Sequence, residues 1–139
     1  MKWVNPKIYE KILEMGVVLE NCPEQEGGLS YGKIASIIRT NNPKKIKVIT
    51  IDGSPHCLML QAAVNEAVYI LGEKVEREHY VLINGKEMIK ISPESIRVAR
   101  YLSLVESLVK KNVEILEELK KVSKEHQKAL ELSDIHIKK

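Results

Sequence analysis

At 139 residues, with 44% hydrophobic and 29% charged side chains, the chain has the composition of one folded domain and not of a disordered segment. The net charge of +3 is small and the lysines stand among glutamates, which argues against a nucleic-acid partner. No apolar run reaches the roughly 18 residues of a membrane helix. The first residues carry no signal-peptide core, so we expect a cytoplasmic protein without a membrane partner. Abundant lysine, glutamate and isoleucine, and the absence of phenylalanine, give the chain a thermophile-like composition.

The first half of the chain reads as helix, strand, helix, strand. Asn5 as cap and Gly16 as stop enclose the first helix. β-branched and apolar residues predict strands at 17–21 and 45–52, and between them a polar loop leads to a helix at 30–40. The second strand is apolar almost throughout, which is typical of a strand that is covered on both faces.

The second half of the chain continues with a buried helix, a hairpin and a long helix. Residues 54–71 are apolar almost all round, which indicates a helix that is buried on more than one side. Asn84 and Gly85 form a hairpin signal between two short strands within residues 78–92. A helical pattern then runs through residues 92–132.

Strands that alternate with helices imply right-handed crossovers and a mainly parallel sheet. The sequence therefore predicts an α/β fold: a small three-layer Rossmann-like domain whose sheet ends in an antiparallel edge hairpin, followed by a long C-terminal helix. We expect residues 1–110 to form this domain and residues 111–132 to extend the C-terminal helix as a candidate coiled coil. Residues 133–139 are predicted to be a flexible tail.

The predicted C-terminal helix carries mostly apolar residues at alternating spacings of four and three, which is the heptad pattern of a coiled coil. The seam comprises Tyr101, Val105, Leu108, Asn112, Ile115, Leu119, Val122, His126 and Ala129. One interpretation is an ordinary amphipathic helix with a charged end. The favoured interpretation is self-association, so the expected partner is a second copy of the chain in a homo-oligomer, a dimer, with a different partner protein as the alternative.

Two cysteines, Cys22 and Cys57, are the only ones in the chain. A structural disulfide is not expected in a cytosolic protein, and neither a C-x-x-C pair nor zinc-ligand spacing is present, so we predict no metal site. Cys22 directly follows the first predicted strand, and Cys57 opens the helix after the second. Because ligands bind beyond the carboxyl ends of parallel strands, both thiols are expected at the functional edge of the sheet if the two strands are neighbours.

The stretch DGSPHC makes the turn from the second strand into the buried helix. Asp52 ends the strand, Gly53 permits a sharp turn and Ser54 is a good helix cap. Cys57 then lies about three residues past the cap, where the helix dipole favours a thiolate. His56 beside it can share or supply a proton. The alternative interpretation is a Cys57 that is buried and inert on the apolar stripe of its helix, with a His56 that is only solvated.

The loop ENCPEQEGGLSYG is longer than the two to six residues that usually join a strand to a helix. Gly27 and Gly28 would let backbone amides approach a ligand, Ser30 can cap the next helix while facing an anion, and Tyr31 could line the site. Glutamates in the same loop would repel a phosphate, and the glycines match neither a P-loop nor a dinucleotide-binding turn. Cys22 is the stronger candidate for a reactive thiol, and the alternative is a free surface thiol or a thiol that is covered by the loop.

A cysteine just after a strand resembles the plan of several small α/β families: sulfur-relay proteins of the DsrE type, rhodanese domains and cysteine-phosphorylated sugar-transport subunits. The resemblance covers only the strand–loop–helix plan. Rhodaneses and low-molecular-weight phosphatases end their cysteine loop with an arginine at the next helix, whereas CPEQEGGLSYGK offers Lys33. The resemblance therefore implies thiol chemistry in general and speaks against these two activities.

Three functions stay open. The first is a thiol-based site of redox or sulfur-transfer type, with Cys22 or Cys57 as the nucleophile and His56 assisting. The second is a non-enzymatic binding or assembly module, and the third is an anion- or nucleotide-binding domain. The candidate ligand-binding residues are Asp52, Gly53, Ser54, Gly27, Gly28, Ser30 and Tyr31. The sequence identifies no cofactor and does not decide whether the chain is an enzyme.

Overall fold

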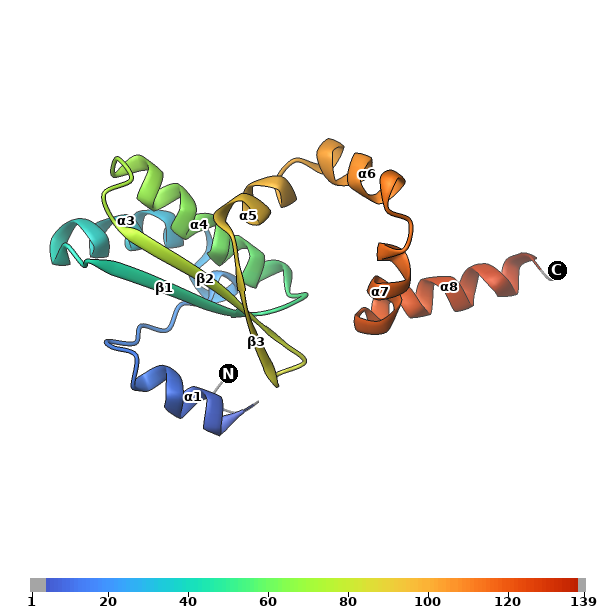
Figure 1. Cartoon of the computed structure of the whole chain (residues 1–139), viewed down its shortest axis with the longest axis horizontal. Coiled ribbons are helices and arrows are strands. Elements are labelled where there is room, and N and C mark those ends of the chain that lie inside the picture. Colours follow the sequence, from blue (N-terminus) through green and yellow to red (C-terminus); the bar gives the residue numbers. More distant parts are fainter. Residues whose placement is uncertain (1–4, 138–139) are drawn as a thin grey trace. The chain divides into compact units, whose positions relative to one another are not determined.

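The computed structural model in Figure 1 describes residues 5–137 of the chain. Contacts between residues divide the chain into two units, Met1–Arg97 and Val98–Lys139. The first unit contains the β-sheet and both cysteines, and the second consists of helices. None of the helices in residues 5–137 is long and apolar enough to cross a membrane.

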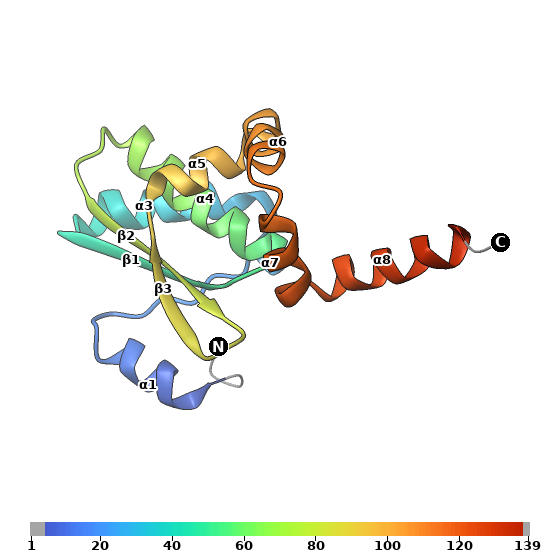
Figure 2. The ribbon, with the colours of Figure 1, turned by 45° about the vertical axis from the view of Figure 1, so that its right-hand side comes forward.

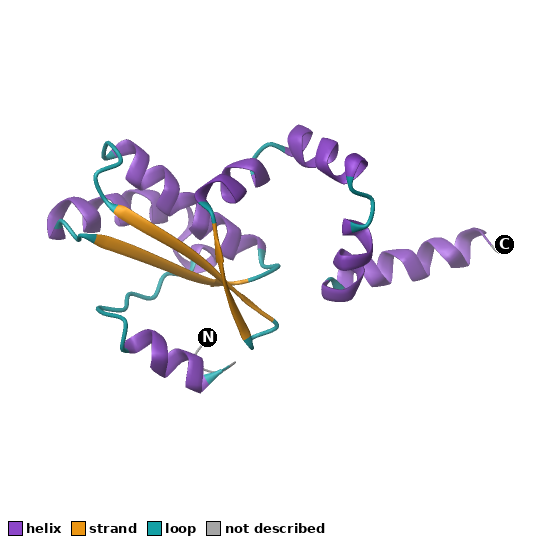
Figure 3. Ribbon diagram, in the orientation of Figure 1, coloured by secondary structure: helices purple, strands orange, loops and turns teal. Residues whose placement is uncertain are grey.

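A mixed sheet forms the centre of the first unit (Figure 3). Its strands are β1 (Lys45–Ile51), β2 (Glu76–Ile83) and β3 (Glu87–Ile91). Their order is β1-β2-β3, with β1 and β2 parallel and β3 antiparallel to β2. Val48 lies beside His79, which in turn lies beside Ile91. The α/β fold with a parallel pair and an antiparallel edge hairpin, as predicted, is confirmed.

Helices cover the sheet on both faces (Figures 1 and 2). α3 (Ser30–Asn41) and α4 (Pro55–Ile70) lie on one face, and α1 (Pro6–Leu13) lies on the other. α4 is the crossover that joins the two parallel strands. The main core lies where α3 and α4 pack on the sheet, and it comprises Ile38, Val48, Val64, Ala67, Val68 and Val75. The three predicted layers are therefore helix, sheet and helix.

The position of α1 follows from its cap. The Asn5 side chain accepts a hydrogen bond from the Ile8 N–H at 3.2 Å and donates one to the Gly85 carbonyl at 2.8 Å. The first bond starts the helix, and the second ties it to the turn between β2 and β3. Ile12 is the buried residue of α1, and Leu82, on the same face of the sheet, is fully buried.

The prediction of a strand at residues 17–21 was wrong. This segment has no strand pairing, although it is rich in β-branched and apolar residues. Val17 is 95% exposed and Leu19 is 64% exposed, so the apolar burial that normally fixes a strand in a sheet is missing here. The segment instead leads the chain from α1 to α2 (Pro23–Glu26) and a 3-10 turn (Gly27–Leu29).

The prediction of a single helix over residues 92–132 was also wrong, because this part of the described chain forms four shorter helices. The segments are α5 (Pro93–Ala99), α6 (Leu102–Lys111), α7 (Ile115–Val122) and α8 (Lys124–Ile137). Tyr101, Asn112 and Ser123 stand at the breaks with non-helical ψ angles of 87°, 75° and 107°. The Ser123 hydroxyl accepts a hydrogen bond from the His126 N–H at 3.1 Å and so caps α8.

The breaks change the predicted coiled-coil seam. Its residues are distributed over α6, α7 and α8, so the described chain contains no continuous four-heptad helix. α8 continues to Ile137, into the residues that the sequence predicts as a flexible tail, and residues 138–139 lie outside the described part. Within the second unit, α6 and α7 contain no buried residue.

Candidate functional site

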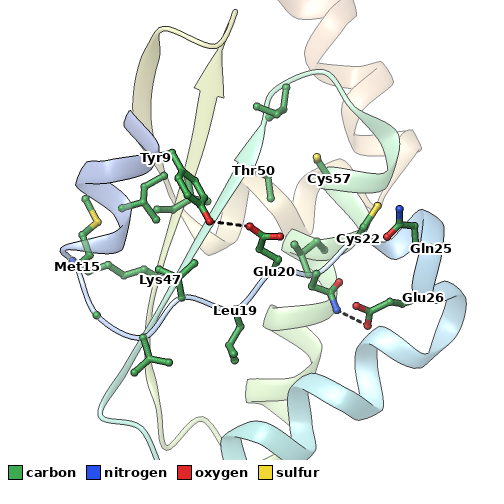
Figure 4. A pocket seen from close by; sticks show the side chains of 18 of the residues that line it. Tyr9, Met15, Leu19, Glu20, Cys22, Gln25, Glu26, Lys47, Thr50 and Cys57 are labelled. Atoms are coloured by element: carbon green, nitrogen blue, oxygen red, sulfur yellow. Dashed lines mark hydrogen bonds between the residues drawn. The ribbon is translucent and has the colours of Figure 1, made fainter. Parts of the chain in front are cut away.

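Both cysteines line one cavity of about 950 Å³ in the first unit. The cavity lies between α1, the segment that follows it, and β1, and Leu19, Ile49 and Leu60 contribute to its apolar lining. Figure 4 shows the sulfur atoms of Cys22 and Cys57 at the same end of this cavity. The predicted convergence of the two thiols is therefore present, although the segment before Cys22 is not a strand.

Cys22 occupies the cap position of α2. Its backbone is extended, with φ −121° and ψ 105°, and its carbonyl accepts hydrogen bonds from the amides of Gln25 at 3.0 Å and Glu26 at 2.9 Å. Pro23, at the first helical position, is buried and anchors the turn. The Cys22 side chain makes no capping hydrogen bond and is half-buried. Its thiol therefore faces the cavity without a structural task in the helix.

Cys57 is the third residue of α4, as predicted. Its N–H donates to the Ser54 hydroxyl at 3.5 Å, and Pro55 occupies the first helical position. Gly53 has a φ of +78°, which only glycine adopts readily, and so allows the abrupt turn from β1 into α4. The Cys57 side chain is half-buried. The dipole of α4 favours negative charge at this end of the helix.

His56 links the two cysteine-bearing turns. Its Nδ1 lies 3.8 Å from a carboxylate oxygen of Glu24 in α2, while both side chains remain largely exposed. An exposed pair of this kind contributes little to stability. The pair connects the start of α2 to the start of α4. His56 itself precedes Cys57 in the chain but does not line the cavity.

The candidate ligand-binding residues 52–54 serve the turn and do not line the cavity. The Asp52 N–H donates to the Leu82 carbonyl at 3.1 Å, which extends the pairing of β1 and β2 by one residue. The Asp52 side chain is exposed. Ser54 is committed to the cap of α4. Any contact of these three residues with a ligand stays a prediction.

The glycine-rich segment is folded into helical turns. Gly27 ends α2 with a φ of +58°, and Gly28 lies in the 3-10 turn. Ser30 was predicted to cap α3, but it is the first residue of this helix. It is buried, and its hydroxyl lies within hydrogen-bonding distance of the Asn21 side-chain oxygen, at 3.3 Å. Because this contact occupies the hydroxyl, the geometry gives the anion-binding interpretation little support. Tyr31 is partly exposed and does not line the cavity.

Charged and polar groups surround the middle of the cavity. The Tyr9 hydroxyl donates to a carboxylate oxygen of Glu20 at 2.9 Å, and this bond raises the pKa of Tyr9. Glu20 is the carboxylate nearest the centre of Figure 4, between Tyr9 and the thiols. Lys45 and Lys47 line the cavity from β1. Sequence reasoning missed Tyr9 and Glu20, because only the arrangement of α1 beside β1 brings them to the site.

A neighbouring ion cluster fixes the lysines. Glu78 lies 3.0 Å from Lys90, 3.4 Å from Lys45 and 3.9 Å from Lys47. Hydrogen bonds from Lys90 and then Tyr80 lower the pKa of Glu78 to about 2. Glu78 is therefore ionised throughout the physiological range, and the three lysines lie beside its carboxylate.

A buried hydrogen-bond network lies on the opposite face of the sheet, below α4. The Gln61 side-chain amide donates to the Thr50 hydroxyl and to the Tyr80 carbonyl, each at 2.9 Å. Its oxygen lies 2.6 Å from Nδ1 of His79, which is fully buried. This complete burial gives His79 a structural role in the first unit. The partner Gln61 was missed, because a glutamine within an apolar helix pattern gives no sign of its contacts.

Within residues 5–137, no group of three or more histidine, cysteine, aspartate or glutamate side chains could hold a metal ion. Among known proteins, a family model described as a Rossmann-like domain matches residues 1–134. No curated protein and no solved structure matches the chain.

Proposed function

We propose that this chain, which belongs to the Rossmann-like domain family, carries a thiol-based site of redox or sulfur-transfer type formed by Cys22 and Cys57. One observation carries the proposal: the only two cysteines of the chain, 35 positions apart, line the same end of one cavity.

The redox form of the proposal balances with a disulfide as the oxidised substrate. The thiolate of one cysteine attacks a substrate sulfur, which forms a mixed disulfide and releases the other substrate sulfur as a thiolate. The second cysteine thiolate then attacks the protein sulfur of the mixed disulfide. This step forms the Cys22–Cys57 bond and releases the second substrate thiolate. Two electrons pass from the protein to the substrate, and His56 can supply a proton to a departing thiolate.

The test is the formation of an intramolecular disulfide by the full chain. After oxidation with excess glutathione disulfide, we expect the peptides that contain Cys22 and Cys57 to be joined in a digest without reductant. Each single variant, Cys22→Ser or Cys57→Ser, should instead retain one glutathione on its remaining thiol. Thiols that react with neither glutathione disulfide nor iodoacetamide in the folded protein would remove the proposal.

A second candidate function, assembly through the C-terminal helices, rests on a separate observation. In the described part of the second unit, several large apolar side chains of α6 and α7 are exposed, namely Leu102, Leu104, Leu108, Ile115, Leu119 and Val122. Helices of eight to ten residues are marginal in water without a partner surface. An apolar face of this kind marks an interaction site.

The charges of α7 favour a second copy of the chain as the partner. Glu117 and Glu118 lie in its first turn, and Lys120 and Lys121 lie in its last. When two copies of α7 pair antiparallel about a two-fold axis, the acidic turn of each faces the basic turn of the other. The proposed assembly is therefore a homodimer.

The dimer is tested by introducing a charge on the apolar face. The double variant Leu108→Asp/Leu119→Asp should raise the dissociation constant of the dimer by at least about 100-fold, because two leucines per copy lose their burial. Light scattering coupled to size exclusion at several concentrations measures it. Ser103→Asp/Ser107→Asp is the matched control, since it places the same two added charges on exposed polar positions of α6. A wild-type chain that stays monomeric at every concentration would exclude the dimer.

A further inference from the structure

The buried layer between β2, α4 and the start of α5 contains three polar side-chain atoms that form no hydrogen bond with any described residue. They are Nε2 of His79, Oδ1 of Asn65 and Nε of Arg77. His79 is 0% exposed and Asn65 is 4% exposed. Buried polar atoms in folded proteins are almost always hydrogen-bonded, so three of them in one layer require an explanation.

The hydrogen-bonding role of each atom is fixed by its neighbours. The Gln61 amide nitrogen donates to the Tyr80 carbonyl, which can only accept, so the Gln61 oxygen is the group that faces His79. Nδ1 of His79 must then carry the proton, which leaves Nε2 as an acceptor.

The same reasoning orients the asparagine. The Asn65 amide nitrogen donates to the Pro93 carbonyl at 3.3 Å, which leaves Oδ1 as an acceptor. Nε of Arg77 can only donate. The layer therefore presents two acceptors and one donor. A water molecule, which donates two hydrogen bonds and accepts up to two, matches this set.

Topology places the three residues near one another. Gln61 and Asn65 are one helical turn apart on α4, and His79 and Arg77 are two residues apart on the same face of β2. Because α4 joins two parallel strands, it runs antiparallel to β2. The direction from Gln61 to Asn65 along α4 is therefore the same as the direction from His79 to Arg77 along β2. Since Gln61 contacts His79, Asn65 is expected beside Arg77.

The start of α5 closes this layer. Pro93 is held by Asn65, and Ile96 in the same helix is 2% exposed. At the rim, Glu73 pairs with Arg77 and lies 3.6 Å from Arg97. A molecule in the layer is thus separated from solvent by an apolar side chain and by ion pairs.

We propose that His79, Asn65 and Arg77 form a binding site for one internal water molecule, which links β2, α4 and the start of α5. The water donates to Nε2 of His79 and to Oδ1 of Asn65 and accepts from Nε of Arg77. The site lies on the face of the sheet opposite to the α1 side of the cavity and is independent of the thiol chemistry. It extends the Gln61 network into a continuous polar connection from Thr50 on β1 to Pro93.

The first test is a crystal structure of the full chain at a resolution that shows ordered solvent. We expect one ordered oxygen within about 2.7–3.2 Å of Nε2 of His79 and within the same range of at least one of the other two atoms. Direct hydrogen bonding between Asn65 and His79, or a layer without a bound oxygen, would overturn the proposal.

The second test counts long-lived water in solution by magnetic relaxation dispersion. Asn65→Leu removes an acceptor and fills the site, so the signal of one long-lived water should be lost. Asn65→Ala is the second variant, for use if the leucine variant does not fold. It leaves the site wider, so at least one long-lived water should remain in it. Asn41→Leu is the matched control, because Asn41 is an exposed asparagine whose side chain bonds the Ile37 carbonyl. Equal signals in the wild type and the folded Asn65→Leu variant would contradict the site.

Discussion

Replacing Gln61 with methionine is expected to lower the free energy of unfolding by about 3 kcal/mol, since each buried group that loses its partner costs about 1–3 kcal/mol. Methionine keeps the length of the side chain, but it leaves the Thr50 hydroxyl, the Tyr80 carbonyl and Nδ1 of His79 without this partner. Urea denaturation followed by circular dichroism measures the change. Gln25→Met is the control, because Gln25 is exposed and should change the stability by less than about 0.5 kcal/mol.

A double variant separates lost hydrogen bonding from poor packing. Gln61→Met/His79→Leu removes both partners of the shortest bond in the network and replaces them with apolar groups, so no unpaired imidazole N–H remains. We expect it to be more stable than Gln61→Met alone. If both variants are equally unstable, the cost lies in packing and the network contributes nothing specific.

The fold was predictable because its main elements carry local signals. The run KIKVITI and the turn at Asn84-Gly85 each indicate their structure within a few residues. Ser54 and Pro55 likewise mark the start of α4. From these elements the parallel pair and its crossover follow by the handedness rule.

The elements that were wrong are those in which local signal and burial disagree. Val17 and Leu19 have the composition of a strand, but they lie on a short segment that passes between two helices, and both are exposed. The heptad pattern continues through Asn112 and Ser123, whose side chains can compete for backbone hydrogen bonds and favour caps. Periodicity in a sequence does not report such interruptions.

The candidate site was predictable only in part. Both cysteines were expected at one edge because each was thought to follow a strand of the sheet. No strand precedes Cys22, so the shared cavity agrees with the expected convergence but not with the reason given for it. Tyr9 and Glu20 could not be found, because their contact depends on how α1 returns over the sheet. Partners of the buried Gln61 likewise depend on the register between α4 and β2.

Acidification from about pH 6.5 to pH 4 is expected to remove up to about 3 kcal/mol of stability through His79. Burial, and then the positive charges of Arg77 and Arg97, lower the pKa of His79 from 6.5 to about 4. Between these values the unfolded chain binds a proton that the folded chain does not. The contribution is therefore fully present above pH 6.5, decreases as the pH falls, and reaches its limit near pH 4.

Carboxylates of the first unit act in a separate pH range. The pKa of Glu78 is lowered to about 2, and the bond to Arg77 lowers the pKa of Glu73. Both carboxylates therefore stabilise the fold at pH values above their ordinary pKa of 4.5, and they lose this effect only at lower pH.

Denaturant titrations at half-unit steps from pH 7.5 to 4.5 thus report mainly on histidine. The variant Gln61→Met/His79→Leu should lose the slope in this range, whereas His56→Gln, at an exposed pair, should retain it. If the free energy of unfolding of the double variant has the same slope against pH as that of the wild type, His79 is protonated in the folded chain without penalty. This result would contradict the neutral imidazole with its proton on Nδ1, on which the Gln61 network depends.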